Sequence, residues 1–158
     1  MNIKLQNLDY YSGFEGENEI RFYANSKSTK FQLKRCPNSS GGYFDVQIHQ
    51  GEFGIHFFSL WEGYFDSLMN IIDRSNYTDL PKVIKDWIEV KGWRWDDLMP
   101  YLITEQELNW FINQIKIVIE DYKRKGKESI IKFKCMVDLL TFLEVALKEE
   151  MEVRISDE

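Results

Sequence analysis

The sequence predicts an α+β domain, in which an N-terminal antiparallel β-meander of about five strands packs its apolar face against a C-terminal layer of about four helices. Through the first 61 residues, apolar side chains alternate with polar ones, which is typical of half-buried strands. After that point they recur with the helical period of about 3.6 residues. The length of 158 residues allows one domain, so residues 1–158 are assigned to a single folded unit.

Five segments near the N-terminus have the alternation of strands. The shortest connection between them, Gln50-Gly51, suits a two-residue hairpin, which would set Ile48 opposite Phe53 and Val46 opposite Ile55. The apolar residues of the five predicted strands are Ile3 and Leu5; Ile20, Phe22 and Ala24; Phe31 and Leu33; Phe44, Val46 and Ile48; and Phe53, Ile55 and Phe57.

The same register predicts a row of polar residues on the opposite face of the sheet. The row would contain Glu19, Lys34, Asp45 and His56, whose charges alternate in sign as cross-strand pairing favours. We interpret Asp45 beside His56 as a cross-strand ion pair. The alternative is a pH-sensitive contact surface, because an exposed histidine titrates near about pH 6.5.

Two capping boxes mark the starts of predicted helices. Ser59 with Glu62 would open the first helix, and Thr104 with Glu107 would open the longest one. The inward faces of these two helices are predicted to hold Phe65, Leu68, Met69 and Ile72, and Leu108, Phe111, Ile112, Ile115, Val118, Ile119 and Tyr122. The basic residues Lys123, Arg124, Lys125 and Lys127 around Gly126 suit the C-terminal end of the longest helix.

Two further helices and a strand complete the prediction. A short helix is expected over residues 79–91, with Pro81 in its first turn. Another helix is expected over residues 137–150, and a short strand over 151–156. Residues 128–136 suit either a strand or a helix, because their apolar side chains alternate immediately before a helical pattern.

The charge and the cysteines restrict the partners and the compartment. The chain has 26 acidic and 20 basic residues, and its formal net charge of −6 favours a basic partner over a nucleic acid. Cys36 and Cys135 have no partner at metal or redox spacing, so we expect free thiols in a reducing cytosol. No signal peptide or apolar span is visible, which predicts a cytoplasmic protein without membrane contact.

Enzymatic motifs are missing from the sequence. None of the nucleophile, phosphate-loop, dinucleotide, zinc-protease or dithiol motifs occurs, and only two histidines could act as general bases. We therefore expect no catalytic residue, no cofactor and no metal.

The segment from Gly92 to Asp97 is the strongest candidate for a partner-binding surface. Tryptophan and arginine are enriched at binding hot spots, and here they stand beside two adjacent carboxylates. The predicted surface contains Trp93, Trp95, Asp96 and Asp97, extended by Glu105 and Glu107. The alternative is that both tryptophans fill the core beneath a loop. A smaller candidate is the loop over residues 9–19, which carries aromatic and acidic side chains.

These features together predict a protein-binding inhibitor. A small acidic chain with aromatic side chains and without catalytic motifs is similar, in these general features alone, to bacterial immunity proteins that neutralise basic nuclease-type toxins by direct binding. The alternative is a small-molecule module with an aromatic-lined pocket between sheet and helices. The oligomeric state stays open.

Overall fold

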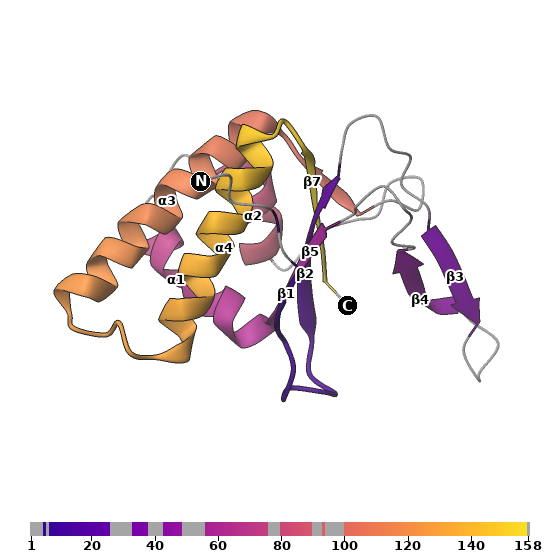
Figure 1. Ribbon diagram of the computed structural model, residues 1–158, viewed down its shortest axis with the longest axis horizontal. Helices are drawn as coiled ribbons and strands as arrows, with labels where there is room; N and C mark the ends of the chain where they lie inside the picture. Colours follow the sequence, from indigo (N-terminus) through magenta and orange to yellow (C-terminus); the bar gives the residue numbers. More distant parts are fainter. Residues whose placement is uncertain are drawn as a thin grey trace.

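The computed structural model describes residues 5, 7–25, 33–37, 43–48, 56–75, 80–89, 93 and 100–157. It shows an α+β protein in which four helices cover one face of a mixed five-stranded sheet (Figure 1). The predicted fold class is therefore confirmed, including the helical layer and the short C-terminal strand.

The elements follow one another along the chain mostly as strands first and helices afterwards. Their bounds are β1 Leu8–Tyr10, β2 Glu19–Asn25, β3 Leu33–Pro37, β4 Tyr43–Ile48, β5 His56–Trp61, α1 Glu62–Ser75, α2 Lys82–Ile88, β6 Tyr101–Ile103, α3 Glu105–Arg124, α4 Ile131–Lys148 and β7 Glu152–Asp157.

Strand β2 lies at the centre of the main sheet, whose order is β1-β5-β2-β7-β6. It pairs antiparallel with β5 on one side and with β7 on the other. Strand β1 pairs parallel with β5, so the sheet is mixed and not the expected antiparallel meander. Strands β3 and β4 form a separate antiparallel pair.

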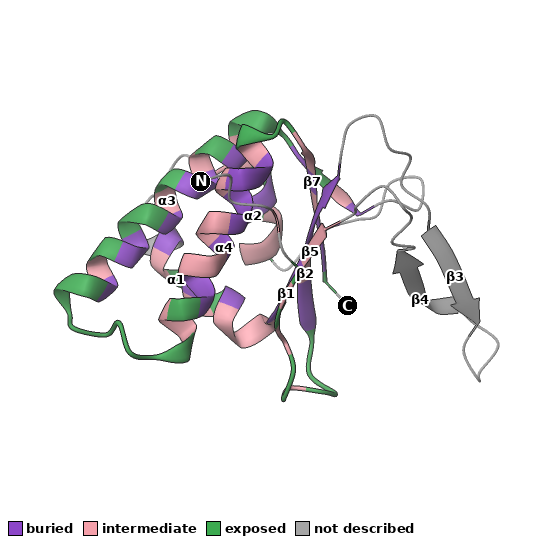
Figure 2. Ribbon diagram, in the orientation of Figure 1, coloured by how far each residue is buried: buried purple, intermediate pink, exposed green. Residues whose placement is uncertain are grey.

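The core lies between the helices and the apolar face of the sheet, where buried residues of both layers meet (Figure 2). The sheet contributes Ile20, Phe22 and Ala24 from β2, Phe58 and Leu60 from β5, and Val153 and Ile155 from β7, each at most 1% exposed. Register keeps them together, because Phe22 lies opposite both Phe58 and Ile155.

The predicted register of β5 is wrong by one residue. The hairpin at Gln50-Gly51 lies outside the described residues, but β5 pairs with β2 and β1 rather than with β4. Phe58 faces the core, and Phe57 lies on the opposite face beneath the guanidinium of Arg21, whose carbon is 5.4 Å from the ring centroid. The segment carries apolar residues at both alternating positions, so alternation alone did not select the buried face.

The predicted polar row is not formed. Glu19 pairs with Trp61 and His56 with Ala24, at opposite ends of the β2–β5 ladder and on opposite faces of the sheet. In the separate pair of strands, Lys34 lies opposite Gln47 and Asp45 opposite Cys36. Asp45 and His56 are therefore not cross-strand neighbours. A local periodicity does not specify which strands pair, and the row depended on that choice.

His56 lies on the core-facing side of β5, and partial burial lowers the pKa of its imidazole. Below about pH 6.5 the unfolded chain therefore binds more protons at this site than the folded chain does, so stability decreases as the pH falls through that range. We expect His56→Gln to lose less stability than the wild type between about pH 7.5 and pH 5.5. Urea unfolding at both pH values measures this, and an equal loss in both proteins would contradict it.

The helix starts differ in how well local sequence predicted them. The Thr104 capping box is confirmed: its hydroxyl accepts a hydrogen bond from the backbone N–H of Glu107, and the Glu107 carboxylate accepts one from the backbone N–H of Thr104. Ser59 does not cap α1. It lies in β5, 3% exposed, and its hydroxyl donates to the carboxylate of Glu19.

The C-terminal half of the chain is more helical than expected. Helix α4 begins at Ile131, so residues 131–136 belong to a helix and not to a strand. Ile131 is 60% exposed, and the buried series begins at Cys135 and Met136 and continues with helical spacing. The alternation that suggested a strand combined the exposed Ile131 with Phe133, which packs against the core, and the buried Cys135, so it did not mark one face of a strand.

The basic residues at the end of α3 have the predicted structural role. Gly126 adopts a positive φ of 66°, which a left-handed cap residue requires. The preceding cations form ion pairs one helical turn back: Lys123 with Glu120 at 3.2 Å, Arg124 with Asp121 at 3.3 Å and Lys125 with Asp121 at 2.7 Å. The ion pair with Lys125 lowers the pKa of Asp121.

Candidate functional site

Trp93 belongs to the core of the domain. It is 3% exposed, and its indole Nε1 donates a hydrogen bond to the carbonyl oxygen of Val83 at 2.9 Å. Its ring stacks on that of Trp87, with centroids 4.8 Å apart, and meets the Phe65 ring edge-on at 5.4 Å. This is the core role that the sequence left open, and it withdraws the Trp93 ring from any contact surface.

Glu107 is also occupied within the fold. Its Oε1 accepts from the backbone N–H of Thr104 at 3.2 Å, and its Oε2 accepts from the backbone N–H of Val83 at 2.9 Å. One carboxylate thus satisfies donors in the first turns of both α2 and α3. Of the predicted surface, Glu105 is the member that the structure shows exposed to solvent. The remaining members, Trp95, Asp96 and Asp97, lie outside the described residues.

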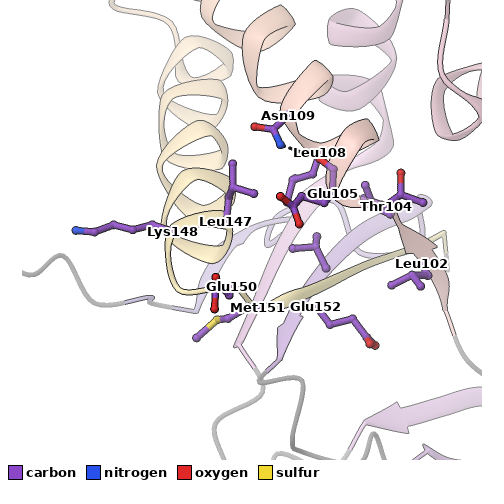
Figure 3. A pocket seen from close by; sticks show the side chains of 12 residues that line it. Leu102, Thr104, Glu105, Leu108, Asn109, Leu147, Lys148, Glu150, Met151 and Glu152 are labelled. Atoms are coloured by element: carbon purple, nitrogen blue, oxygen red, sulfur yellow. Dashed lines mark hydrogen bonds between the residues drawn. The ribbon is translucent and has the colours of Figure 1, made fainter.

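Glu105 lines a pocket of about 480 Å³ at the corner where β6 leads into α3 and α4 leads into β7 (Figure 3). The residues that line it come from two segments, 102–109 and 147–153. Their apolar members are Leu102, Ile103, Leu108, Leu147, Met151 and Val153. The pairing of β6 with β7, in which Ile103 lies opposite Val153, brings the two segments together. Sequence patterns within either segment gave no sign of this pairing.

The turn that closes α4 places Glu150 on the rim of this pocket. Helices α3 and α4 end in the same motif: Lys127 N–H donates to the Tyr122 carbonyl at 3.0 Å, and Met151 N–H to the Ala146 carbonyl at 2.9 Å. Helix α3 has Gly126 at the left-handed position, whereas α4 has Glu150 there, with φ of 52°. A side chain at such a position is strained, because its Cβ approaches the following carbonyl.

Replacing Glu150 with glycine is expected to stabilise the protein by about 0.5–1 kcal/mol, because glycine adopts this backbone conformation without strain. The matched control is Glu149→Gly, one residue earlier, where φ is −85° and glycine is expected to destabilise by a similar amount. Urea unfolding of both variants measures the difference. A lower stability for Glu150→Gly than for the wild type would contradict the strain argument.

Three aromatic rings meet where the loop between β1 and β2 contacts the start of α1. Phe14 stacks on Trp61 with centroids 4.3 Å apart and an angle of 3° between the rings. Tyr64 meets both rings edge-on, at 5.6 Å from Phe14 and 5.3 Å from Trp61. All three side chains are half-buried. A Cβ at Gly63 would overlap the Trp61 ring, so glycine is required for the ring to lie there.

The loop that presents Phe14 is held by its own hydrogen bonds. Asp9 accepts from the backbone N–H groups of Tyr11 at 2.8 Å and Ser12 at 3.0 Å. The Tyr11 hydroxyl donates to the carbonyl oxygen of Glu17 at 2.6 Å and closes the loop. Gly13 and Gly16 have φ values of 96° and 94°, which allow the tight turns. The loop is therefore ordered before any partner binds.

The loop that presents Phe14 is rich in acidic residues. Residues 9–19 contain four acidic and no basic side chains, and Glu62 follows Trp61 directly. Glu15 and Glu17 are exposed, and hydrogen bonds from the backbone lower the pKa of Glu15. We name Phe14, Glu15, Glu17, Trp61 and Tyr64 the aromatic–acidic surface. The sequence marked its loop as the smaller of two candidates but did not identify Trp61 and Tyr64 as members.

Other reactive groups are few among the residues that the structure describes. Cys135 is a free thiol, 1% exposed, and burial raises its pKa, which disfavours the nucleophilic thiolate. Tyr10 donates to Asp138, and burial also raises the pKa of this tyrosine. Within the described ranges, no three histidine, cysteine, aspartate or glutamate side chains gather as metal ligands.

No family model, curated protein or solved structure matches this chain. None of the helices in the described part of the chain combines the length and the hydrophobicity that a membrane span requires. The features of the described chain that indicate a function are therefore the aromatic–acidic surface and the pocket.

Proposed function

We propose that this protein is an inhibitor that binds a basic protein, specifically a bacterial immunity protein that neutralises a basic nuclease-type toxin by direct contact. The observation that carries the proposal is the aromatic–acidic surface, in which a loop with exposed carboxylates stacks its Phe14 ring on Trp61 at the end of β5. This is the combination of residue types that the sequence predicted for a contact surface, at a different place in the fold.

The aromatic rings supply the short-range part of binding. Tyrosine and tryptophan are the residues that carry most energy at interfaces, because each offers a large apolar area with few torsions to immobilise. In this surface the packing of Phe14 against Trp61 already fixes both rings. Binding therefore loses little side-chain entropy, which favours affinity.

The carboxylates supply the long-range electrostatic attraction between this chain and its partner. Glu15 and Glu17 lie on a segment without basic residues, in a chain with a net charge of −6. Such a field accelerates encounter with a positively charged protein and repels phosphate backbones. A nuclease domain that binds nucleic acid through basic residues offers the complementary charge.

A small-molecule module is the second candidate. The pocket of about 480 Å³ is within the usual size range of ligand sites. The apolar part of its lining is aliphatic, whereas the sequence predicted aromatic residues. Native mass spectrometry of the protein purified from its own cells separates the two candidates, because a retained metabolite would favour the module and a retained basic protein the inhibitor.

Phe14→Ala tests the aromatic part of the surface. It removes the outer ring of the stack and leaves the backbone hydrogen bonds of the loop in place. With a basic protein captured from the native lysate and then purified, we expect dissociation to accelerate by about 30-fold, the effect of losing a hot-spot residue. Surface plasmon resonance measures the rate. Ile117→Ala, which truncates a 55% exposed side chain on α3, is the matched control.

Removing two charges tests the electrostatic part. The double variant Glu15→Gln, Glu17→Gln keeps the hydrogen-bond acceptors but removes two negative charges from the loop. We expect slower association and a weaker dependence of the association rate on salt, with little change in dissociation. The control is Glu120→Gln with Glu128→Gln, which changes net charge equally near the end of α3 and in the turn that follows it.

The proposal would be wrong if the captured protein were acidic. It would also be wrong if the Phe14 variant and the Glu15/Glu17 double variant each bound the captured protein as their own control variants do. The adjacent gene offers an independent check. For an immunity protein we expect a gene for a large secreted toxin, or for a nuclease domain, next to the gene for this chain.

A further inference from the structure

The pocket beside Glu105 combines apolar walls with acidic side chains. Aliphatic side chains from both segments form the walls, among them Leu102, which is 45% exposed, and the half-buried Leu147 and Met151. Figure 3 shows these side chains around one hollow between the ends of α3 and α4 and strands β6 and β7. An exposed aliphatic wall of this kind binds another aliphatic group favourably.

The electrostatics of the pocket favour a cation. Among the described residues, the carboxylates of Glu105 and Glu150 form no ion pair, whereas Glu152 accepts from Arg154 Nε at 2.5 Å. Lys148 extends away from the other lining side chains (Figure 3). The C-terminal end of α4 also faces the pocket, and its carbonyl groups add partial negative charge.

The N-terminal end of α3 does not reverse this preference. Its first-turn N–H groups would attract an anion, but the Thr104 capping box already satisfies one of them. Glu105 carries its own negative charge at the same helix end. An anionic ligand would therefore meet two unpaired carboxylates, and a neutral aliphatic ligand would desolvate them without compensation.

We propose that this pocket receives an arginine or lysine side chain of the basic protein partner. The aliphatic stem would pack against Leu102, Leu147 and Met151, and the charged head would pair with the carboxylates of Glu105 and Glu150. The volume of about 480 Å³ exceeds that of one side chain, so neighbouring apolar residues of the partner fill the remainder. The inference rests on the proposed function, because it takes its occupant from the same partner.

The strain at Glu150 is consistent with this role. A glycine at that position, as at the end of α3, would satisfy the helix end without strain but would bring no carboxylate to the rim. The chain thus carries a charged side chain at a backbone position where charge does not assist folding.

The test uses peptide probes and needs no purified partner. Acetyl-Val-Arg-Val-amide is titrated into the ¹⁵N-labelled full chain, alongside the same peptide with citrulline, the neutral isostere of arginine. We expect the amide signals of residues 102–109 and 147–153 to shift, and the citrulline peptide to bind about five- to tenfold more weakly.

Two variants and one control locate the effect. Glu105→Gln with Glu150→Gln is expected to abolish the preference for arginine over citrulline, while Glu120→Gln with Glu128→Gln retains it. Leu102→Ala, at an exposed position that tolerates truncation, is expected to weaken both peptides. Amide spectra that remain dispersed in each variant verify that the chain is folded.

Three results would overturn the inference. These are equal binding of the citrulline peptide, shifts confined to the aromatic–acidic surface, and binding of butylguanidinium alone as tightly as the peptide, which would assign the pocket to a small organic cation. The proposed function fails by a separate result, because it depends on the captured protein and on the Phe14 variant, neither of which the peptide titration uses.

Discussion

The position of β2 between β5 and β7 determines the rest of the structure. Its side chains serve both faces: Phe22 lies in the core beneath the helices, while Tyr23 on the other face is 1% exposed. Pairing of Glu19 with Trp61 brings the β1–β2 loop to the start of α1, where the aromatic–acidic surface forms. Pairing of Asn25 with Glu152 brings the chain after α4 to the other end of β2, where the pocket forms.

Local sequence correctly predicted the features that depend on interactions between residues close together in the chain. The capping box at Thr104 and the seven buried positions of α3 depend on contacts within a few residues or on one helical face. The choice of strand partners, in contrast, depends on contacts between segments that are far apart in the sequence. Nothing in the alternation of β5 indicated that it would pair with β2 and, in parallel, with β1, because several apolar strands satisfy the same period. The final strand was predicted, but its place beside the central strand was not.

The same limit applies to the predicted contact surface, of which Trp95, Asp96 and Asp97 lie outside the described residues. Tryptophan is enriched at binding hot spots and carboxylates attract basic partners, but tryptophan also suits cores and glutamate also suits helix caps. The fold uses Trp93 and Glu107 in those structural roles. Phe14 and Trp61 are 47 positions apart in the sequence and meet only because β2 and β5 pair. A surface assembled from distant segments leaves no local pattern, although the acidic loop that contributes to it was visible.

The two candidate contact regions lie at opposite ends of one rigid strand. Strand β2 has seven residues, so its ends are about 20 Å apart. A protein interface of ordinary size covers about 800 Å² on each partner and is about 30 Å across, which exceeds the length of β2. Because β2 holds them at a fixed separation, binding at the second region requires no further ordering of this chain. If both proposed contacts form, the partner places its basic side chain near one end of β2 and accepts the rings near the other, and this geometric requirement separates it from basic proteins that match the charge alone.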